Sequence, residues 1–243
     1  MKKYMVILAL ILCSVTVNAA EKITLSTLDW EPYIGKEIKD NGYVAVLVKE
    51  AFRRGGLEAD FQFDRWSRVV GLAKSGQVDG YFPEYFSESI KAYALFSDPF
   101  PGGPIGFFKL KHKDISFNRL EDLKGLKIGT VKGYVNTKEF DEADYLNKDA
   151  VKDDLTNFKK LAAERLDLVV ADKFVGLNLI KKHMPDKAGQ IEFMAKFLEE
   201  KDLFVCISNK VANADAKVEA FNAGLKQMKA DGTIDKILIK YGF

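Results

Sequence analysis

The stretch from Val78 to Pro104 contains residue types that suit contact with a small ligand. Its centre, Pro83-Glu84-Tyr85-Phe86, places one carboxylate among aromatic rings, and Phe96-Ser97-Asp98-Pro99-Phe100 follows as a rigid turn. Aromatic faces offer apolar contact and attract cations. The stretch is therefore either the wall of a ligand site or a surface loop with a few inward-facing rings, and its residues alone leave both interpretations open.

Residues 1–19 have the pattern of a secretory signal peptide. Lys2-Lys3 gives a basic start, Met5–Leu12 is apolar but too short to span a membrane, and Val17-Asn18-Ala19 resembles a cleavage signal. We expect cleavage after about Ala19 and a soluble protein in the periplasm, not embedded in the membrane. An uncleaved anchor is the alternative.

Composition limits the classes of partner. Without Lys2 and Lys3 the chain would carry 35 basic and 35 acidic residues, and this balance gives no support to nucleic-acid binding. His112 and His183 lack metal-ligand spacing, and Cys206 lies in an apolar run as a buried hydrophobe. We expect no metal, no cofactor and a monomer.

Apolar periodicity predicts alternating strands and helices. Val44 to Phe52 has helical spacing and ends at Gly55-Gly56, and Asn136 with Glu139 resembles a capping box that opens another helix. Strands are predicted at 23–28, 59–63, 105–110, 127–131, 150–155, 167–171, 191–194 and 203–208, and another is predicted to begin at Val78, before the loop Pro83-Glu84-Tyr85-Phe86. Helices are predicted at 44–52, 66–75, 120–123, 158–164 and 173–183 and twice more near the C-terminus. Such alternation is typical of an α/β fold with mainly parallel sheets flanked by helices.

A faint internal repeat favours two lobes. Residues 72–79 and 161–167 each contain a helix end, a tight turn and an Asp before a strand, although chance similarity is the alternative. Two such units would place a cleft where loops at the carboxyl ends of the strands meet. Strand crossings near 107–111 and 197–204 would form a hinge.

Several short sequence motifs resemble those of the family 3 extracellular solute-binding proteins, the periplasmic receptors of polar amino-acid ABC transporters. They follow the family's order across essentially the whole mature chain: Gly76-Gln77-Val78-Asp79-Gly80, the turn 96–100, residues 120–129, Arg165-Leu166-Asp167 through Asp172, and residues 229–237. The resemblance implies the type II periplasmic-binding-protein fold, with a two-strand hinge and a cleft that closes on its ligand. It places lobe 1 at 20–107 plus 204–243 and lobe 2 at 108–203.

The resemblance also implies ligand contacts. The carboxylate that holds a ligand amino group falls on Asp172, with a helix N-cap as the alternative role. The aromatic ring against the ligand falls on Tyr33, with Trp30 close by, and core packing is the alternative for Trp30. The segment Gly133-Tyr134-Val135-Asn136 matches the loop whose backbone N–H groups face the ligand carboxylate.

One departure from the family concerns the residue that would bind the ligand carboxylate. The family's clamping arginine falls on Ile90, and the adjacent Lys91 cannot reproduce a bidentate guanidinium fork. Bulky Pro83-Glu84-Tyr85 stands where the family has small polar residues. Arg68 could take an anionic group instead, or it is a solvated helix residue. Glu84 would favour a cationic or amine-bearing ligand if it points inward.

We therefore predict a protein that captures a small polar, amino-acid-like solute and delivers it to an ABC transporter permease, and we predict that it is not an enzyme. Two alternatives remain open. One is a dehydratase-like enzyme on the same fold, with Glu84 and Arg68 as its reactive pair. The other is a ligand-sensing module for a membrane receptor.

Overall fold

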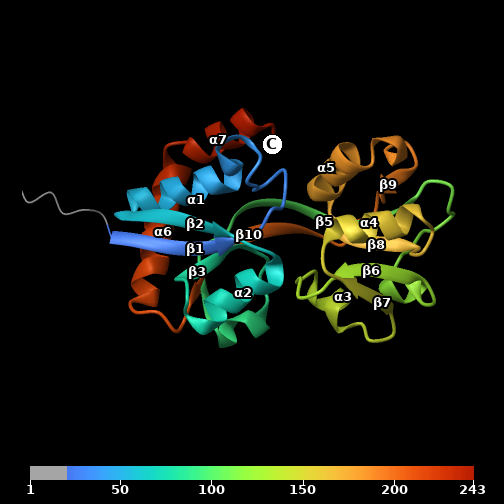
Figure 1. Cartoon of the computed structure of the whole chain (residues 1–243), viewed down its shortest axis with the longest axis horizontal. Helices are drawn as coiled ribbons and strands as arrows, with labels where there is room; N and C mark the ends of the chain where they lie inside the picture. Colours follow the sequence, from blue (N-terminus) through green and yellow to red (C-terminus); the bar gives the residue numbers. More distant parts are fainter. Residues whose placement is uncertain (1–20) are drawn as a thin grey trace, which may run out of the picture.

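The computed structural model describes residues 21–243, and the predicted signal peptide lies outside them. Two α/β lobes lie side by side and are joined by two long strands (Figure 1). Both termini of the described chain belong to the first lobe. This arrangement is the two-lobed fold that the sequence predicted.

The first lobe is a mixed sheet with strand order β2-β1-β3-β10. Its strands are β1 (Glu21–Thr27), β2 (Leu57–Phe63), β3 (Gly80–Glu84), the short β4 (Ala94–Phe96) and the end of β10 (Glu199–Ser208). Its helices are α1 (Tyr43–Arg54), α2 (Trp66–Ser75), α6 (Ala214–Ala230) and α7 (Thr233–Tyr241). In α1 the apolar spacing buries Val44, Leu47, Val48 and Phe52 completely, and Phe52 packs on Phe221 of α6. The N-terminal and C-terminal parts of the chain therefore share one core.

The second lobe has the strand order β5-β8-β6-β7. Its strands are β6 (Lys127–Val131), β7 (Asn147–Val151), β8 (Leu168–Asp172), β9 (Ile191–Phe193) and the end of β5 (Phe100–Leu110). Its helices are α3 (Lys138–Glu142), α4 (Asp154–Ala162) and α5 (Lys173–His183). Strand β6 runs parallel to β7 and β8, whereas β5 is antiparallel to β8.

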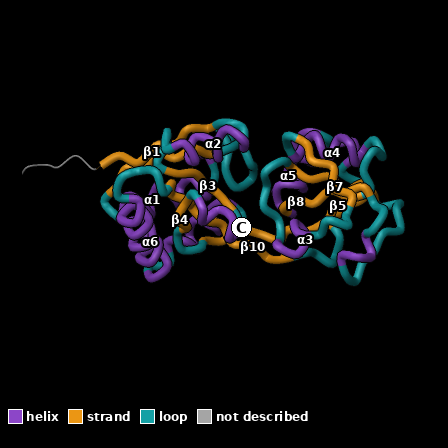
Figure 2. The backbone as a smooth tube through the Cα atoms, turned by 90° about the horizontal axis from the view of Figure 1, so that it is seen from below, coloured by secondary structure: helices purple, strands orange, loops and turns teal. Residues whose placement is uncertain are grey.

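Strands β5 and β10 cross between the lobes. They pair antiparallel from Glu199↔Ile105 to Leu203↔Phe100, with a register shift between Lys201 and Leu203. Beyond this pairing β10 joins β3, and β5 joins β8. Figure 1 shows both strands between the lobes, and Figure 2 shows β10 there from below. On β5 this pairing covers Phe100 to Ile105, so it ends before the first crossing that the sequence predicted, near 107–111. The residue boundaries of the lobes stay a prediction.

Most element predictions are confirmed, including β6 and α5 at their predicted residues. The capping box at Asn136 is wrong. Thr137 caps α3 instead, because its hydroxyl accepts from the backbone N–H of Phe140, while Asn136 donates to Asp141. Strand β3 also continues through Pro83 and Glu84, where a loop was expected.

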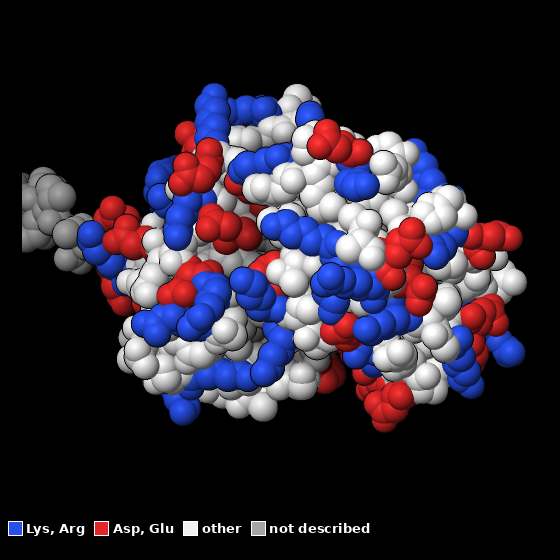
Figure 3. All heavy atoms as spheres, turned by 45° about the vertical axis from the view of Figure 1, so that its right-hand side comes forward, with Lys and Arg blue, Asp and Glu red and all other residues white. Residues whose placement is uncertain are grey.

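Among residues 21–243, no helix combines the length and the apolar character needed to cross a bilayer. On the face drawn in Figure 3, basic and acidic side chains are interspersed.

Candidate functional site

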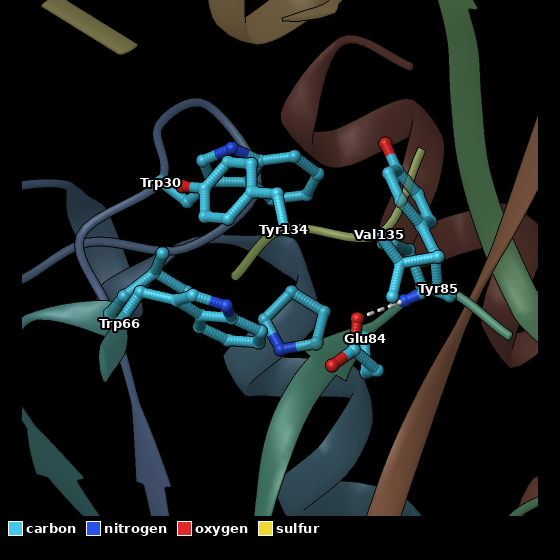
Figure 4. A pocket seen from close by; sticks show the side chains of 9 residues that line it. Trp30, Trp66, Glu84, Tyr85, Tyr134 and Val135 are labelled. Atoms are coloured by element: carbon cyan, nitrogen blue, oxygen red, sulfur yellow. Dashed lines mark hydrogen bonds between the residues drawn. The ribbon is translucent and has the colours of Figure 1, made fainter. Parts of the chain in front are cut away.

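A small cavity of about 30 Å³ lies between the lobes, and we call it the central cavity. A groove of about 770 Å³ shares Leu28, Trp30, Trp66 and Tyr134 with it. Nine residues line the central cavity: Leu28, Trp30, Trp66, Pro83, Glu84, Tyr85 and Leu203 from the first lobe or the crossing strand β10, and Tyr134 and Val135 from the second lobe. Figure 4 shows Trp30, Trp66 and Tyr134 on one side of this space and Tyr85, Val135 and Glu84 on the other. Five of the predicted site residues therefore meet here, namely Trp30, Glu84, Tyr85, Tyr134 and Val135.

The sheet topology explains why these residues meet. Trp30 follows β1, Glu84 ends β3 and Tyr85 comes directly after it, and Tyr134 and Val135 follow β6. Each therefore lies at the carboxyl end of a parallel strand, where α/β folds place their ligands. Trp66 is the first residue of α2 and was predicted only as part of a helix face, so the sequence analysis missed it as a site residue.

Aromatic rings form most of the cavity wall. Trp30 stacks on Tyr33 with ring centroids 4.8 Å apart, and its edge contacts Tyr85 at 5.9 Å. Across the cleft, Trp66 and Tyr134 meet edge to face at 5.7 Å. The Trp66 indole N–H also donates to the backbone carbonyl of Gly133 at 2.9 Å, so one side chain contacts the second lobe twice.

Glu84 is the one acid among the nine lining residues, and only 4% of its surface is exposed. Oε1 accepts from the backbone N–H of Tyr85 at 2.9 Å, and Oε2 accepts from the Tyr81 hydroxyl at 3.1 Å. Burial raises the pKa of Glu84 to about 8, although these hydrogen bonds oppose the shift. A cation that pairs with this buried group would therefore stabilise its ionised form.

Asp172 lies at the end of β8, where only 3% of its surface is exposed. Its Oδ1 accepts from the backbone N–H groups of Phe174 and Val175, at 2.8 and 3.1 Å, and so caps α5. Its Oδ2 accepts from the hydroxyls of Tyr33 and Tyr85, at 2.9 and 3.2 Å, and both tyrosines belong to the first lobe. Burial raises the pKa of Asp172 to about 6, against the effect of these four donors. The N-cap alternative is therefore realised, and Asp172 also joins the lobes.

Tyr33 is fully buried between Trp30 and Phe243 and does not line the central cavity. Asp172 does not line it either. The predicted ligand roles of these two residues stay predictions, since each is engaged with protein groups in this arrangement.

Asp154 is a buried acid that the sequence analysis missed. It begins α4, is 6% exposed, and lines a wider groove that it shares with Trp30, Trp66 and Tyr134. Burial raises its pKa to about 7, and the side chains of Tyr134 and Trp30 oppose the shift. The sequence signal was the acidic pair Asp153-Asp154: Asp153 accepts from the backbone N–H of Thr156 as the N-cap, and both acids line the groove.

Arg68 lies outside the central cavity. Its guanidinium pairs with Asp64 at 2.8 Å on the surface, where 55% of the Arg68 side chain is exposed. Ile90 is buried, and Lys91 pairs with Glu88 on the surface at 2.9 Å. No guanidinium therefore replaces the clamping arginine among the residues that line this cavity.

The loop 133–136 offers fewer backbone donors than predicted. The N–H of Tyr134 donates to the carbonyl of Val131, and the N–H of Asn136 donates to Asp141. Tyr134 and Val135 still reach the central cavity, whereas Asn136 lines only the neighbouring groove, which shares Glu84, Tyr134 and Val135 with that cavity. Across the described chain, no three His, Cys, Asp or Glu side chains are grouped so as to hold a metal ion.

Comparison with known proteins agrees with this geometry. The sequence profile of the bacterial extracellular solute-binding proteins, family 3, matches residues 26–243. The chain belongs to this family. The family's proteins are extracellular binding proteins, and the two lobes with a cavity between them fit that description.

Individual relatives are distant. The chain is 26% identical to the putative amino-acid ABC transporter-binding protein PatH of Vibrio harveyi, over 96% of this chain and 93% of PatH. It is 23% identical to the L-cystine-binding protein TcyJ of Escherichia coli (strain K12), over 85% of this chain and 76% of TcyJ. The structure of an ancestral arginine-binding protein bound to arginine has a TM-score of 0.75 and 24% identity, over 90% of this chain and 97% of that one. At this identity, the structural likeness shows the fold alone.

Proposed function

We propose that this family member is a periplasmic receptor that encloses a small polar, amino-acid-like solute bearing an ammonium group and delivers it unchanged to an ABC transporter permease. The observation that carries the proposal is the central cavity together with the wider groove that shares its wall, since the two place aromatic rings and buried acids between lobes joined by paired strands. The relatives named for amino-acid transport and for L-cystine binding support the same class of solute.

The division of the cavity between the lobes implies an order of binding. The solute first meets Trp30, Trp66 and Glu84, which belong to the first lobe. Rotation about β5 and β10 then brings Tyr134 and Val135 over it. Closure excludes water, which strengthens the charged contacts inside the cavity.

The enzyme alternative loses its proposed reactive pair. Glu84 lines the cavity, but Arg68, the cationic partner that it would need, pairs with Asp64 outside it. A sensing role has support from fold alone, because the sensor domain of a histidine kinase has a TM-score of 0.78 at 20% identity.

Isothermal titration against amino acids, amines and small peptides tests the proposal, together with small-angle scattering of the free and liganded protein. We expect one class of solute to bind with a measurable decrease in the radius of gyration. The mass of whatever co-purifies with the protein would identify a natural candidate. If no solute in the panel binds and no compaction occurs, the proposed function is wrong.

A further inference from the structure

The central cavity and the wider groove differ in size. The cavity of about 30 Å³ has room for about two water molecules, whereas the groove has about 770 Å³. An ammonium group is similar in size to a water molecule, but the rest of an amino-acid-like solute is much larger. Both spaces border one aromatic wall, since they share Leu28, Trp30, Trp66 and Tyr134. A solute that places its nitrogen beside Glu84 would therefore keep its larger part in the groove.

The wider groove carries positive charge from both lobes. Four cations line it, two from each lobe: Lys36, Arg65, Lys132 and Lys152. Two of them have an acid close by. The Lys36 ammonium lies 4.0 Å from Asp29, and the Lys152 ammonium lies 3.7 Å from Asp153. Among residues 21–243, no carboxylate oxygen lies within 4.0 Å of either of the other two cations, Arg65 and Lys132.

The acid next to Arg65 in sequence is already engaged. Asp64 accepts from the backbone N–H of Arg65 with Oδ1 at 2.8 Å, and its Oδ2 pairs with the Arg68 guanidinium at 2.8 Å. The side chain of Arg65 is exposed at the groove. A guanidinium presents a planar fork of N–H donors that matches a carboxylate. Arg65 can therefore supply in the groove the contact that Ile90 cannot supply at the family's position.

Lys132 lies at the same junction from the other lobe. The Trp66 indole donates to the carbonyl of Gly133 at 2.9 Å, and the Trp66 ring meets Tyr134 at 5.7 Å. Arg65 directly precedes Trp66, and Lys132 directly precedes Gly133, so the two cations flank one contact between the lobes. Lys132 is exposed and also lines the neighbouring groove. Closure would therefore bring a second positive charge toward a carboxylate bound at Arg65.

Acids line the wider groove as well, so it is not simply a site for anions. They are five in number: Asp29, Glu31, Asp64, Asp153 and Asp154. The first four accept a hydrogen bond from a protein group or pair with a lysine, at 2.7 to 2.9 Å. The fifth, Asp154, is buried beside Trp30 and Tyr134. Charges of both signs in one space suit a zwitterion better than a simple anion.

We infer, on the basis of the proposed binding function, that Arg65 binds the carboxylate of the solute in the wider groove, with Lys132 joining it on closure, while the ammonium group enters the central cavity. Arg65 is then the residue by which this receptor prefers a solute with both charges over one that lacks the carboxylate.

Pairs of ligands that differ only at the carboxylate test the inference on the wild-type protein. Arginine and argininamide, histidine and histidinamide, and lysine and lysinamide keep the same side chain, and at pH 6 both members of a pair keep a protonated α-amino group. Titration calorimetry should show about tenfold or tighter binding of the acid in at least one pair. This preference should shrink between about 50 mM and about 500 mM NaCl, because salt screens exposed charges. Any other solute that binds is compared with its own amide.

Variants assign the preference to Arg65. Arg65→Gln should weaken binding of the preferred acid about tenfold or more and change binding of its amide less than about twofold. Arg65→Lys should restore only part of the preference, because an ammonium cannot reproduce the bidentate fork. Lys132→Gln should weaken binding of the acid about threefold. The matched control is Arg68→Gln, which removes an arginine three residues away that does not line the groove, and it should change neither affinity.

The outcomes separate the inference from the proposed function. If every amide binds as tightly as its acid, or only solutes without a carboxylate bind, the inference is wrong and the receptor function stands. If the acid is preferred but Arg65→Gln keeps that preference, the inference is also wrong, and its loss in Lys201→Met would place the carboxylate in the neighbouring groove. If nothing binds and nothing compacts, the proposed function fails with it.

Discussion

Two buried carboxyl groups in the cleft differ in what surrounds them. Asp172, at the start of α5, accepts four hydrogen bonds, and two of these come from tyrosines of the other lobe. Glu84, at the end of β3, is equally buried but accepts two, and it lines the central cavity. Burial raises the pKa of Asp172 only to about 6, and that of Glu84 to about 8.

The difference separates a structural acid from one that is available to a ligand. Burial alone does not distinguish the two residues. Their remaining acceptor positions do, because a fully hydrogen-bonded carboxylate gains little from a further donor. We therefore propose that Asp172 stabilises the contact between the lobes and that Glu84 contacts the ligand.

The largest effect should come from removing Asp172. Asp172→Ala leaves two backbone N–H groups and two tyrosine hydroxyls without an acceptor, so we expect the free energy of unfolding to fall by about 3–5 kcal/mol. Asp172→Asn keeps an acceptor and should cost about 1–2 kcal/mol. Urea unfolding measures both values. A loss below about 0.5 kcal/mol in Asp172→Ala would show that this carboxylate is no structural acid.

A smaller effect should follow pH. The folded protein keeps the Glu84 proton up to a pKa of about 8, whereas the unfolded chain loses it near 4.5, so the folded state binds more protons between these values. The unliganded protein should therefore lose about 2–4 kcal/mol of stability between pH 5 and pH 8 through this group.

The control for this pH effect is Glu84→Gln, which should remove the largest single share of the slope. Asp154→Asn and Asp172→Asn should each remove less, because burial raises the pKa values of these two acids only to about 7 and about 6. Unfolding midpoints at four or five pH values measure the slope. A slope that Glu84→Gln leaves unchanged would assign it to other groups.

A single neutral contact between the lobes should matter less than either acid. Trp66→Phe keeps an aromatic ring but removes the N–H that donates to Gly133, so we expect about 1 kcal/mol less stabilisation of the closed form. Affinity for a bound solute should fall about fivefold, with a smaller compaction in scattering. Unchanged affinity would mean that the ligand closes the lobes without this hydrogen bond.

The smallest effect should belong to Arg68. It is exposed and pairs with Asp64 within the first lobe, so Arg68→Ala should change stability by less than about 0.5 kcal/mol and affinity by less than about twofold. Titration with the best ligand measures this. A large loss of affinity would restore Arg68 as the partner of an anionic group, as one interpretation of the sequence allowed.

The sequence predicted the fold well because each element has its own signal. The apolar spacing of α1 predicted that helix, and the glycines that follow it predicted where it ends. Residues 173–183 form α5 as predicted. The site was predicted less completely. Trp66 shows the same helical spacing whether it faces the core or a cavity, and Asp154 becomes distinct only once Asp153 is known to cap α4.

Hydrogen-bond saturation could not be predicted at all. The four donors to Asp172 come from Tyr33, Tyr85 and α5, and the tyrosines are 139 and 87 residues away in sequence. Only the packing of one lobe on the other brings them to a single carboxylate. For the same reason, the sequence could not tell that Arg68 pairs with Asp64 outside the cavity.

The most direct test of the account is a crystal structure of the protein with its tightest-binding solute. We expect the ligand nitrogen within hydrogen-bond distance of Glu84, surrounded by Trp30, Trp66 and Tyr134, with the Tyr33 and Tyr85 hydroxyls still on Asp172. A ligand ammonium on Asp172, with those two hydroxyls displaced and Glu84 unoccupied, would contradict it.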